Sequence, residues 1–162
     1  MNEKLNIAAE KLGKKLLSLE LRLATAESCT AGLISITLAA VENSGNFYTS
    51  GFVTYSDDAK SRMLDVQPET LEQHTAVSEQ TAREMAAGAR ARSGEAISLA
   101  ITGYAGPDGG EDGTPAGTLW FGWGLPGGEI IAEKKLFKGE PKSVMEEGTL
   151  FALTRLCELL QA

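Results

Sequence analysis

The chain has few of the residues that bind metals or form disulfides. It contains one histidine, His74, and two cysteines, Cys29 and Cys157, among 162 residues. One histidine is too few for a histidine-ligated zinc site and leaves a single candidate for the histidine of a Ser-His-Asp triad. The two cysteines are not spaced as a metal-binding pair. We expect no metal and no cofactor. Sparse, unpaired cysteines are typical of a reducing compartment, so we expect a cytoplasmic protein.

The chain also lacks an excess of positive charge and a long apolar run. Lys and Arg number 15 against 22 Asp and Glu, which gives a formal charge of −7. Nonspecific nucleic-acid binding needs a basic face, so we expect no nucleic-acid partner. No apolar run has the length of a membrane span, and Met1–Gly13 does not resemble a secretion signal, so we expect no membrane association. The length and the ordinary globular composition predict one domain over residues 1–162.

Helical and strand patterns alternate along the sequence. Four helices are expected at 2–18, about 30–41, 79–93 and 143–160. Two short helices are expected to begin after the cap Ser56 and at Pro68. The strands are expected at 21–26, 47–55, 95–103, 118–124 and 129–137, the last two forming a hairpin. Strands interleaved with helices predict an α/β protein, a three-layer α/β/α sandwich with a mixed sheet.

One short stretch concentrates reactive side chains between a strand and a helix. Its four consecutive residues carry a carboxylate, a hydroxyl, a thiol and a second hydroxyl: Glu27, Ser28, Cys29 and Thr30. The unpaired N–H groups at the start of a helix favour an anion or a developing oxyanion there. A single Ser or Thr at this point is an ordinary helix cap, but three such residues after a glutamate exceed what a cap needs. We interpret Ser28 as a nucleophile and prefer Glu27 as a buried scaffold carboxylate.

A base for Ser28 has to come from a residue other than histidine. Tyr55 and Lys60 lie at the end of the next predicted strand and on the first turn of the following helix, where both can face the same sheet edge as Ser28. A desolvated lysine loses its proton readily and can deprotonate a serine. Tyr55 would relay the proton or hold the lysine in place. The alternative is a solvated Lys60 with Tyr55 packed at the strand end, and spacing alone does not decide between them.

A glycine-rich segment, Gly103–Gly117, follows the predicted strand 95–103. Ligands bind at strand ends in α/β sheets, and closely spaced glycines let backbone amides approach a ligand. The segment is neither a dinucleotide fingerprint nor a P-loop, because no Gly-Lys-Ser/Thr follows. A flexible surface loop fits the pattern at least as well as a binding loop.

Four ordered motifs, with two weaker ones, are similar to those of a known family. The stretches are Ala26–Gly32, Gly51–Lys60, His74–Ser78 and Ile101–Pro107, with weaker matches at Gly117–Thr118 and Phe137–Gly139. Over nearly its whole length the chain resembles the CinA C-terminal domain family, the nicotinamide-nucleotide amidases.

The resemblance implies a three-layer α/β/α fold, a homo-oligomer, and a small-molecule nucleotide substrate. The implied reaction is metal-free hydrolysis of the carboxamide of nicotinamide mononucleotide, or of a related pyridine amide, to the acid and ammonia. Ser28 would attack, Lys60 and Tyr55 would support it, and amides near Thr30–Gly32 would hold the oxyanion. The two loops would bind the substrate through Glu27, Cys29, Thr30, Ala31, Gly32, Thr102, Gly103, Ala105 and Gly106.

The chain departs from the family pattern where phosphate would be recognised. The family usually has Gly-Gly at Ala31-Gly32, a small aliphatic residue at Tyr104, glycine at Asp108, Gly-Asp-Arg at Gly139-Glu140-Pro141, and often arginine at Met145. Arginine holds phosphate through two parallel hydrogen bonds, which Lys142 only partly replaces. Ser28, Tyr55 and Lys60 all match the residues of the family pattern, which favours a working amidase. The altered residues favour the alternative, a diverged paralogue that binds a nucleotide or a protein partner without turnover.

Overall fold

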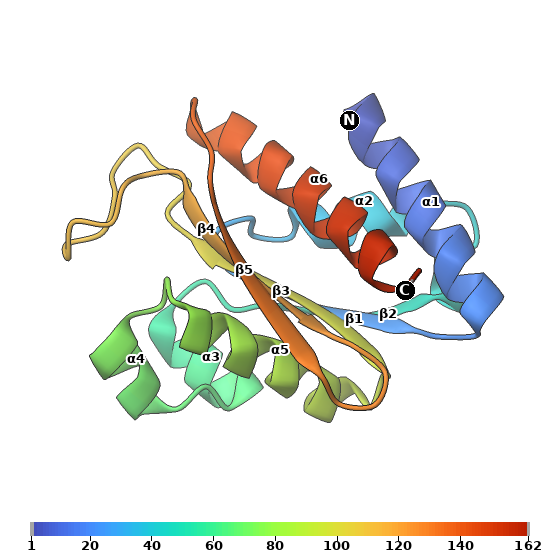
Figure 1. The fold of residues 1–162 in the computed structure, drawn as a ribbon, viewed down its shortest axis with the longest axis horizontal. Coiled ribbons are helices and arrows are strands. Elements are labelled where there is room, and N and C mark those ends of the chain that lie inside the picture. The colour runs from blue at the N-terminus through green and yellow to red at the C-terminus, as the bar shows by residue number, and fades with distance from the viewer. Residues whose placement is uncertain (1, 162) are drawn as a thin grey trace.

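The computed structural model describes residues 2–161 and has a five-stranded mixed sheet between two layers of helices (Figure 1). The strands are β1 (Leu23–Glu27), β2 (Tyr48–Val53), β3 (Ile97–Gly103), β4 (Thr118–Gly124) and β5 (Ile130–Leu136). The helices are α1 (Glu3–Leu19), α2 (Leu33–Ala39), α3 (Asp57–Leu64), α4 (Pro68–His74), α5 (Glu79–Ser93) and α6 (Pro141–Leu159), with a short 3₁₀ turn at Ser44–Asn46. The predicted α/β/α sandwich is confirmed.

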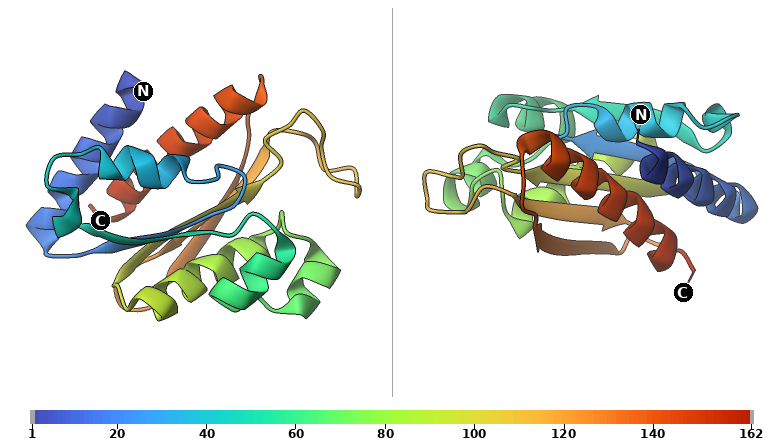
Figure 2. Two further views of the ribbon diagram at one scale, coloured as in Figure 1. Left: turned by 180° about the vertical axis from the view of Figure 1, so that it is seen from behind. Right: turned by 90° about the horizontal axis from the view of Figure 1, so that it is seen from above.

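The two helical layers bury different kinds of side chain on the two faces of the sheet. Helices α1, α2 and α6 cover one face and α3, α4 and α5 the other (Figure 2). In β3 the large Leu99 and Ile101 point into the core under the first layer. The small Ala100 faces α5, and the Ser98 hydroxyl donates to the Ala86 carbonyl at 2.7 Å. This alternation of large and small residues lets α5 lie close to the sheet while α1 and α6 cover a thicker core.

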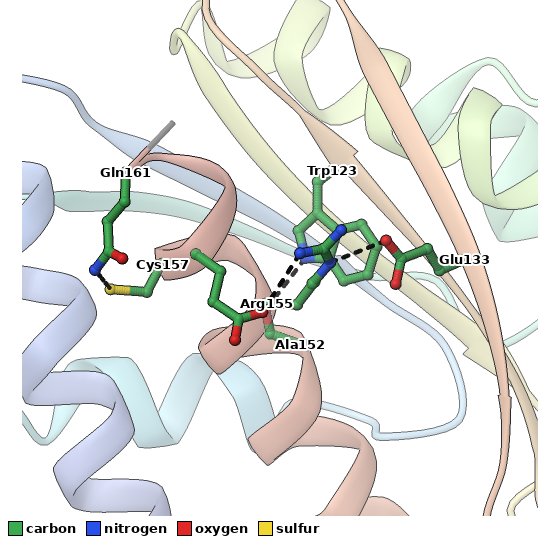
Figure 3. A network of polar contacts seen from close by, with 7 residues as sticks. Trp123, Glu133, Ala152, Arg155, Cys157 and Gln161 are labelled. Atoms are coloured by element: carbon green, nitrogen blue, oxygen red, sulfur yellow. Dashed lines mark hydrogen bonds and ion pairs between the residues drawn. The ribbon is translucent and has the colours of Figure 1, made fainter.

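Polar contacts join the second half of α6 to strands β4 and β5 (Figure 3). The fully buried Trp123 of β4 donates its indole N–H to the Ala152 carbonyl at 3.1 Å. Arg155 pairs with Glu133 of β5 at 2.9 Å. No helix among residues 2–161 is long and apolar enough to cross a membrane.

Two helices begin two or more residues away from their predicted starts. The helix expected from about Thr30 begins at Leu33, because Ala31 (φ 50°) and Gly32 (φ 107°) both adopt the left-handed conformation and cannot belong to a right-handed helix. The last helix begins at Pro141, two residues earlier than expected, since proline is tolerated at the first helical position.

The topology brings the ends of three parallel strands to one edge of the sheet. β1 is parallel to both of its neighbours, β2 and β3. The connection from β1 to β2 runs through α2 on one face, whereas the connection from β2 to β3 runs through α3–α5 on the other. Ligands of open α/β sheets bind at such a reversal, outside the carboxyl ends of the strands. Ser28 follows β1 directly at this point.

Candidate active site

A buried lysine and a buried serine meet at the carboxyl end of β1. The Lys60 Nζ donates to the Ser28 Oγ at 2.9 Å, although 32 positions separate the two residues. The Ser28 side chain is 7% exposed and Lys60 is 1% exposed. The Nζ also donates to the carbonyls of Thr54, at 3.0 Å, and Tyr55, at 3.3 Å. The structure therefore brings into contact the serine and the lysine that the sequence suggested as a pair.

Burial favours the neutral form of the Lys60 amine, which is the form that can accept a proton. Desolvation lowers the pKa of Lys60 from its ordinary value of 10.5, against smaller opposing effects of Asp57 and Cys29. In the neutral amine two N–H bonds can serve the two carbonyl acceptors, and the lone pair is then free for the Ser28 hydroxyl proton. The geometry suits proton transfer from Ser28 to Lys60.

Helix α3 holds Lys60 in place through its cap and its packing. The Ser56 hydroxyl accepts from the Ala59 amide at 3.1 Å and closes the first turn. At the other end α3 lies so close to α5 that a Cβ on Gly88 would fall 2.0 Å from the Leu64 carbonyl oxygen. Only glycine fits at this crossing, and the close approach fixes the helix that carries the lysine.

The Glu27 carboxylate organises the other side of the site. It is fully buried, and one oxygen accepts from the Thr30 hydroxyl at 2.7 Å and from the amides of Gly32 and Ile34 at 3.2 and 2.9 Å. The other oxygen accepts from the amide and the hydroxyl of Ser35, both at 2.9 Å. The anion expected at this helix N-terminus is thus the protein's own carboxylate. It fixes the turn on which Ser28 sits.

The neighbouring thiol is a poor rival to Ser28. Burial, with a smaller contribution from the nearby Glu27, raises the pKa of Cys29 to about 12. The thiolate is the nucleophilic form of cysteine, so almost none of it is present near neutral pH. Ser28, with a base in contact, is the better-supplied nucleophile.

A pocket of about 310 Å³ is lined by Lys60 and by Cys29, the residue after Ser28, whereas Ser28 itself is not among its lining residues. Seven of the residues predicted for the site line it: Cys29, Tyr55, Lys60, Thr102, Gly103, Ala105 and Gly106. The glycine-rich segment is therefore a wall of the pocket and not only a surface loop. A larger cavity of about 420 Å³ lies between α1 and residues 41–47, away from these groups.

Four residues predicted to bind substrate do not line the pocket. Glu27 and Thr30 are buried and satisfy each other, while Ala31 and Gly32 turn the chain into α2. The predicted oxyanion amides also need correction, since the Ala31 amide donates to the Ser28 carbonyl and the Gly32 amide to Glu27. Within residues 2–161, the amides of Cys29 and Thr30 are the ones in this turn that donate to no oxygen.

Tyr55 contacts Lys60 through its backbone. Its carbonyl accepts from Lys60, but its side chain is 70% exposed and stands at the pocket wall. Across the described chain, its hydroxyl forms no hydrogen bond with Ser28 or Lys60. The Tyr55 carbonyl helps to hold the Lys60 amine, and the residue is one of those that line the pocket.

Five residues of the pocket wall were not predicted from the sequence. They are Asp57, Ala76, Val77, Tyr104 and Asp108. Ala76 and Val77 belong to a motif that carried the family resemblance but received no role. The Thr102 hydroxyl donates to the Ala76 carbonyl at 2.8 Å, which ties this segment to the end of β3. No group of three or more potential metal ligands occurs among residues 2–161.

Comparison with known proteins decides the family. The model of the CinA C-terminal domain matches residues 5–160. The chain belongs to the CinA C-terminal domain family. This confirms the resemblance noted from the sequence motifs.

Relatives and solved structures are similar along almost the whole chain. Protein YdeJ of Escherichia coli (strain K12) is 48% identical over 149 residues, which cover 92% of this chain and 86% of YdeJ. Nicotinamide-nucleotide amidohydrolase PncC of the same strain is 39% identical over 148 residues, covering 91% and 90%. A CinA superfamily protein from Klebsiella pneumoniae has a TM-score of 0.95 at 42% identity, covering 99% of both chains. A competence or damage-inducible protein from Enterobacter asburiae has a TM-score of 0.94 at 50% identity, covering 96% and 98%.

The Glu27 network predicts a large cost for a nearly isosteric change. In Glu27→Gln an N–H₂ group replaces an acceptor oxygen and faces donors from Ser35 or from the α2 turn. At least one buried backbone amide loses its acceptor, and the remaining hydrogen bonds are made to a neutral group, so we expect a decrease of about 2–4 kcal/mol in the free energy of unfolding. Chemical denaturation of the purified variant measures it.

The matched control for this substitution is Glu72→Gln on the exposed side of α4. Surface changes of this kind stay within about 0.5 kcal/mol. Equal stabilities of the two variants would contradict the capping role of Glu27.

Proposed function

We propose that this protein hydrolyses the carboxamide of a nicotinamide derivative to the carboxylic acid and ammonia. The observation that carries the proposal is the 2.9 Å contact between the buried Ser28 Oγ and Lys60 Nζ beside a pocket. The substrate class is supported by the similarity to PncC, whose name states a nicotinamide-nucleotide amidohydrolase.

In the first step Ser28 attacks the carbonyl carbon of the amide. The Oγ–H bond breaks, its proton passes to the neutral Lys60 amine, and a tetrahedral oxyanion forms. Lys60, now an ammonium, then gives that proton to the amide nitrogen. The C–N bond breaks, ammonia leaves, and the acyl group stays on Ser28.

The backbone after Ser28 supplies the donors for the oxyanion. The amides of Cys29 and Thr30 donate to no oxygen within residues 2–161 and lie directly after the nucleophile. Backbone N–H groups in such a turn stabilise developing negative charge without reorganising. The Glu27 cap keeps the turn rigid, although it occupies the amides further along.

The second step reverses the roles of the groups. A water molecule attacks the acyl carbon while Lys60 accepts one of its protons. The bond between the acyl carbon and the Ser28 Oγ then breaks, and Lys60 returns the proton to the serine. The acid leaves, and both side chains regain their starting forms.

Removing either member of the pair should abolish or cripple turnover. With nicotinamide mononucleotide and nicotinamide riboside as separate substrates, we expect Ser28→Ala to release ammonia only at background level. Lys60→Met should lose about 10²–10⁴-fold in rate, the usual contribution of a general base. Lys11→Met on the exposed side of α1 is the control and should retain the native rate. Native-like ammonia release by Ser28→Ala would contradict the mechanism.

The lowered pKa of Lys60 predicts how the rate depends on pH. The neutral amine is the active form, so kcat/KM should rise with pH as Lys60 loses its proton and level off below pH 10.5. By the same sign, the folded chain holds fewer protons than the unfolded chain between the lowered pKa and 10.5, so this group's contribution to stability rises with pH in that window. A pH–rate profile measures the first effect. Lys60→Arg, which cannot deprotonate, should remove the rising limb, and a rate that falls with pH throughout would contradict the assignment.

A further inference from the structure

The pocket wall carries more negative than positive charge. Lys60 is the one basic side chain among the described residues that line it, and its Nζ is already engaged by Ser28 and two carbonyls. Two carboxylates, Asp57 and Asp108, line the same space and are exposed at its rim. A phosphate dianion is normally held by arginine, lysine or free backbone amides. No side chain among the described lining residues is a basic group that is free to bind a phosphate.

The nearest long-helix N-terminus does not supply a phosphate site either. Helix α6 begins beside the pocket loop, since a Cβ on Gly106 would lie 3.6 Å from the Pro141 Cγ. The first turn of a helix attracts anions through its unpaired N–H groups. Here the cap residue is Glu140, which brings a negative charge, and the first position is Pro141, which has no N–H. Both features oppose phosphate at this end of α6.

Two tyrosines are among the residues that line the same pocket. Tyr55 and Tyr104 line it together with the two carboxylates. Tyr104 is held by the loop itself, because a Cβ on Gly110 would fall 2.7 Å from its ring atoms. Aromatic faces and carboxylates both attract cations. The wall is therefore suited to a positively charged, flat group.

We propose that the site is selective for carboxamides carried on a positively charged pyridine ring without a phosphate, with Asp57 and Asp108 favouring the ring cation and disfavouring a phosphorylated substrate. Nicotinamide riboside belongs to this class, and nicotinamide mononucleotide adds a phosphate to it. The selectivity rests on the proposed amidase function, which places the amide carbon at Ser28. The carboxylates act by charge on the bound substrate and take no part in proton transfer.

The test compares four amides as substrates of the purified protein. Ammonia release is measured for nicotinamide riboside, nicotinamide mononucleotide, 1-methylnicotinamide and uncharged nicotinamide, with Ser28→Ala as background. We expect kcat/KM to be at least about tenfold higher for the riboside than for the mononucleotide, and higher for 1-methylnicotinamide than for nicotinamide. The riboside and the mononucleotide share the ring cation, so their difference measures the repulsion between the phosphate and the two carboxylates. 1-Methylnicotinamide and nicotinamide differ in the ring cation itself, so their difference measures its attraction to the carboxylates and aromatic residues.

The variant arm uses Asp108→Asn, with Glu111→Gln in the same loop as the matched control. Glu111 is exposed and does not line the pocket. We expect Asp108→Asn to reduce the ratio of riboside to mononucleotide kcat/KM by about five- to tenfold, and Glu111→Gln to leave the ratio unchanged.

The outcomes separate the two proposals. Turnover of the mononucleotide equal to or better than that of the riboside would overturn the selectivity and leave the amidase standing. Ammonia at the Ser28→Ala background from all four amides would overturn the amidase itself. An Asp108→Asn ratio that matches the Glu111→Gln ratio would remove the role of the carboxylate.

Discussion

The site depends on keeping an amine buried next to a hydroxyl. Burial of Lys60 disfavours its charged form, and the three oxygens around its Nζ compensate the amine for the water it has lost. An exposed lysine would stay protonated near neutral pH and could not accept the Ser28 proton. The proposed proton transfer therefore requires the burial as much as it requires the two side chains.

Two independent pieces of packing maintain this contact. On the β1 side, Glu27 collects five donors and fixes the turn that carries Ser28. On the β2 side, α3 is locked against α5 by the close approach at Gly88, which sets the position of Lys60. Because the two pieces belong to opposite faces of the sheet, the active pair is assembled only when both helical layers are in place. The glycine-rich loop after β3 then adds the outer wall and its negative charges.

The sequence predicted the sheet and the helices. It also suggested Ser28 and Lys60 as a pair, because parallel strands end at a common edge and reactive residues followed two of those strands, but spacing alone left a solvated Lys60 equally open. It did not predict that the backbone amides at the start of α2 donate to Glu27, since that depends on the direction of the Glu27 side chain. It also missed Asp57, Tyr104 and Asp108 as pocket residues. Periodicity indicates which face of an element is buried, but it does not show how a loop of many glycines folds back over a strand end. For the same reason the exposed position of the Tyr55 phenol was not foreseen.

The central claim is that Lys60 is an amine of lowered basicity in contact with Ser28, and it can be measured without any substrate. Lysine side-chain NMR of the folded protein, with Lys60→Met to assign the resonance, gives the titration midpoint of this one group. We expect a midpoint clearly below 10.5, separated from those of the exposed lysines. A midpoint at 10.5 or above would contradict the account, because the amine would then stay protonated and could not serve as the base for Ser28.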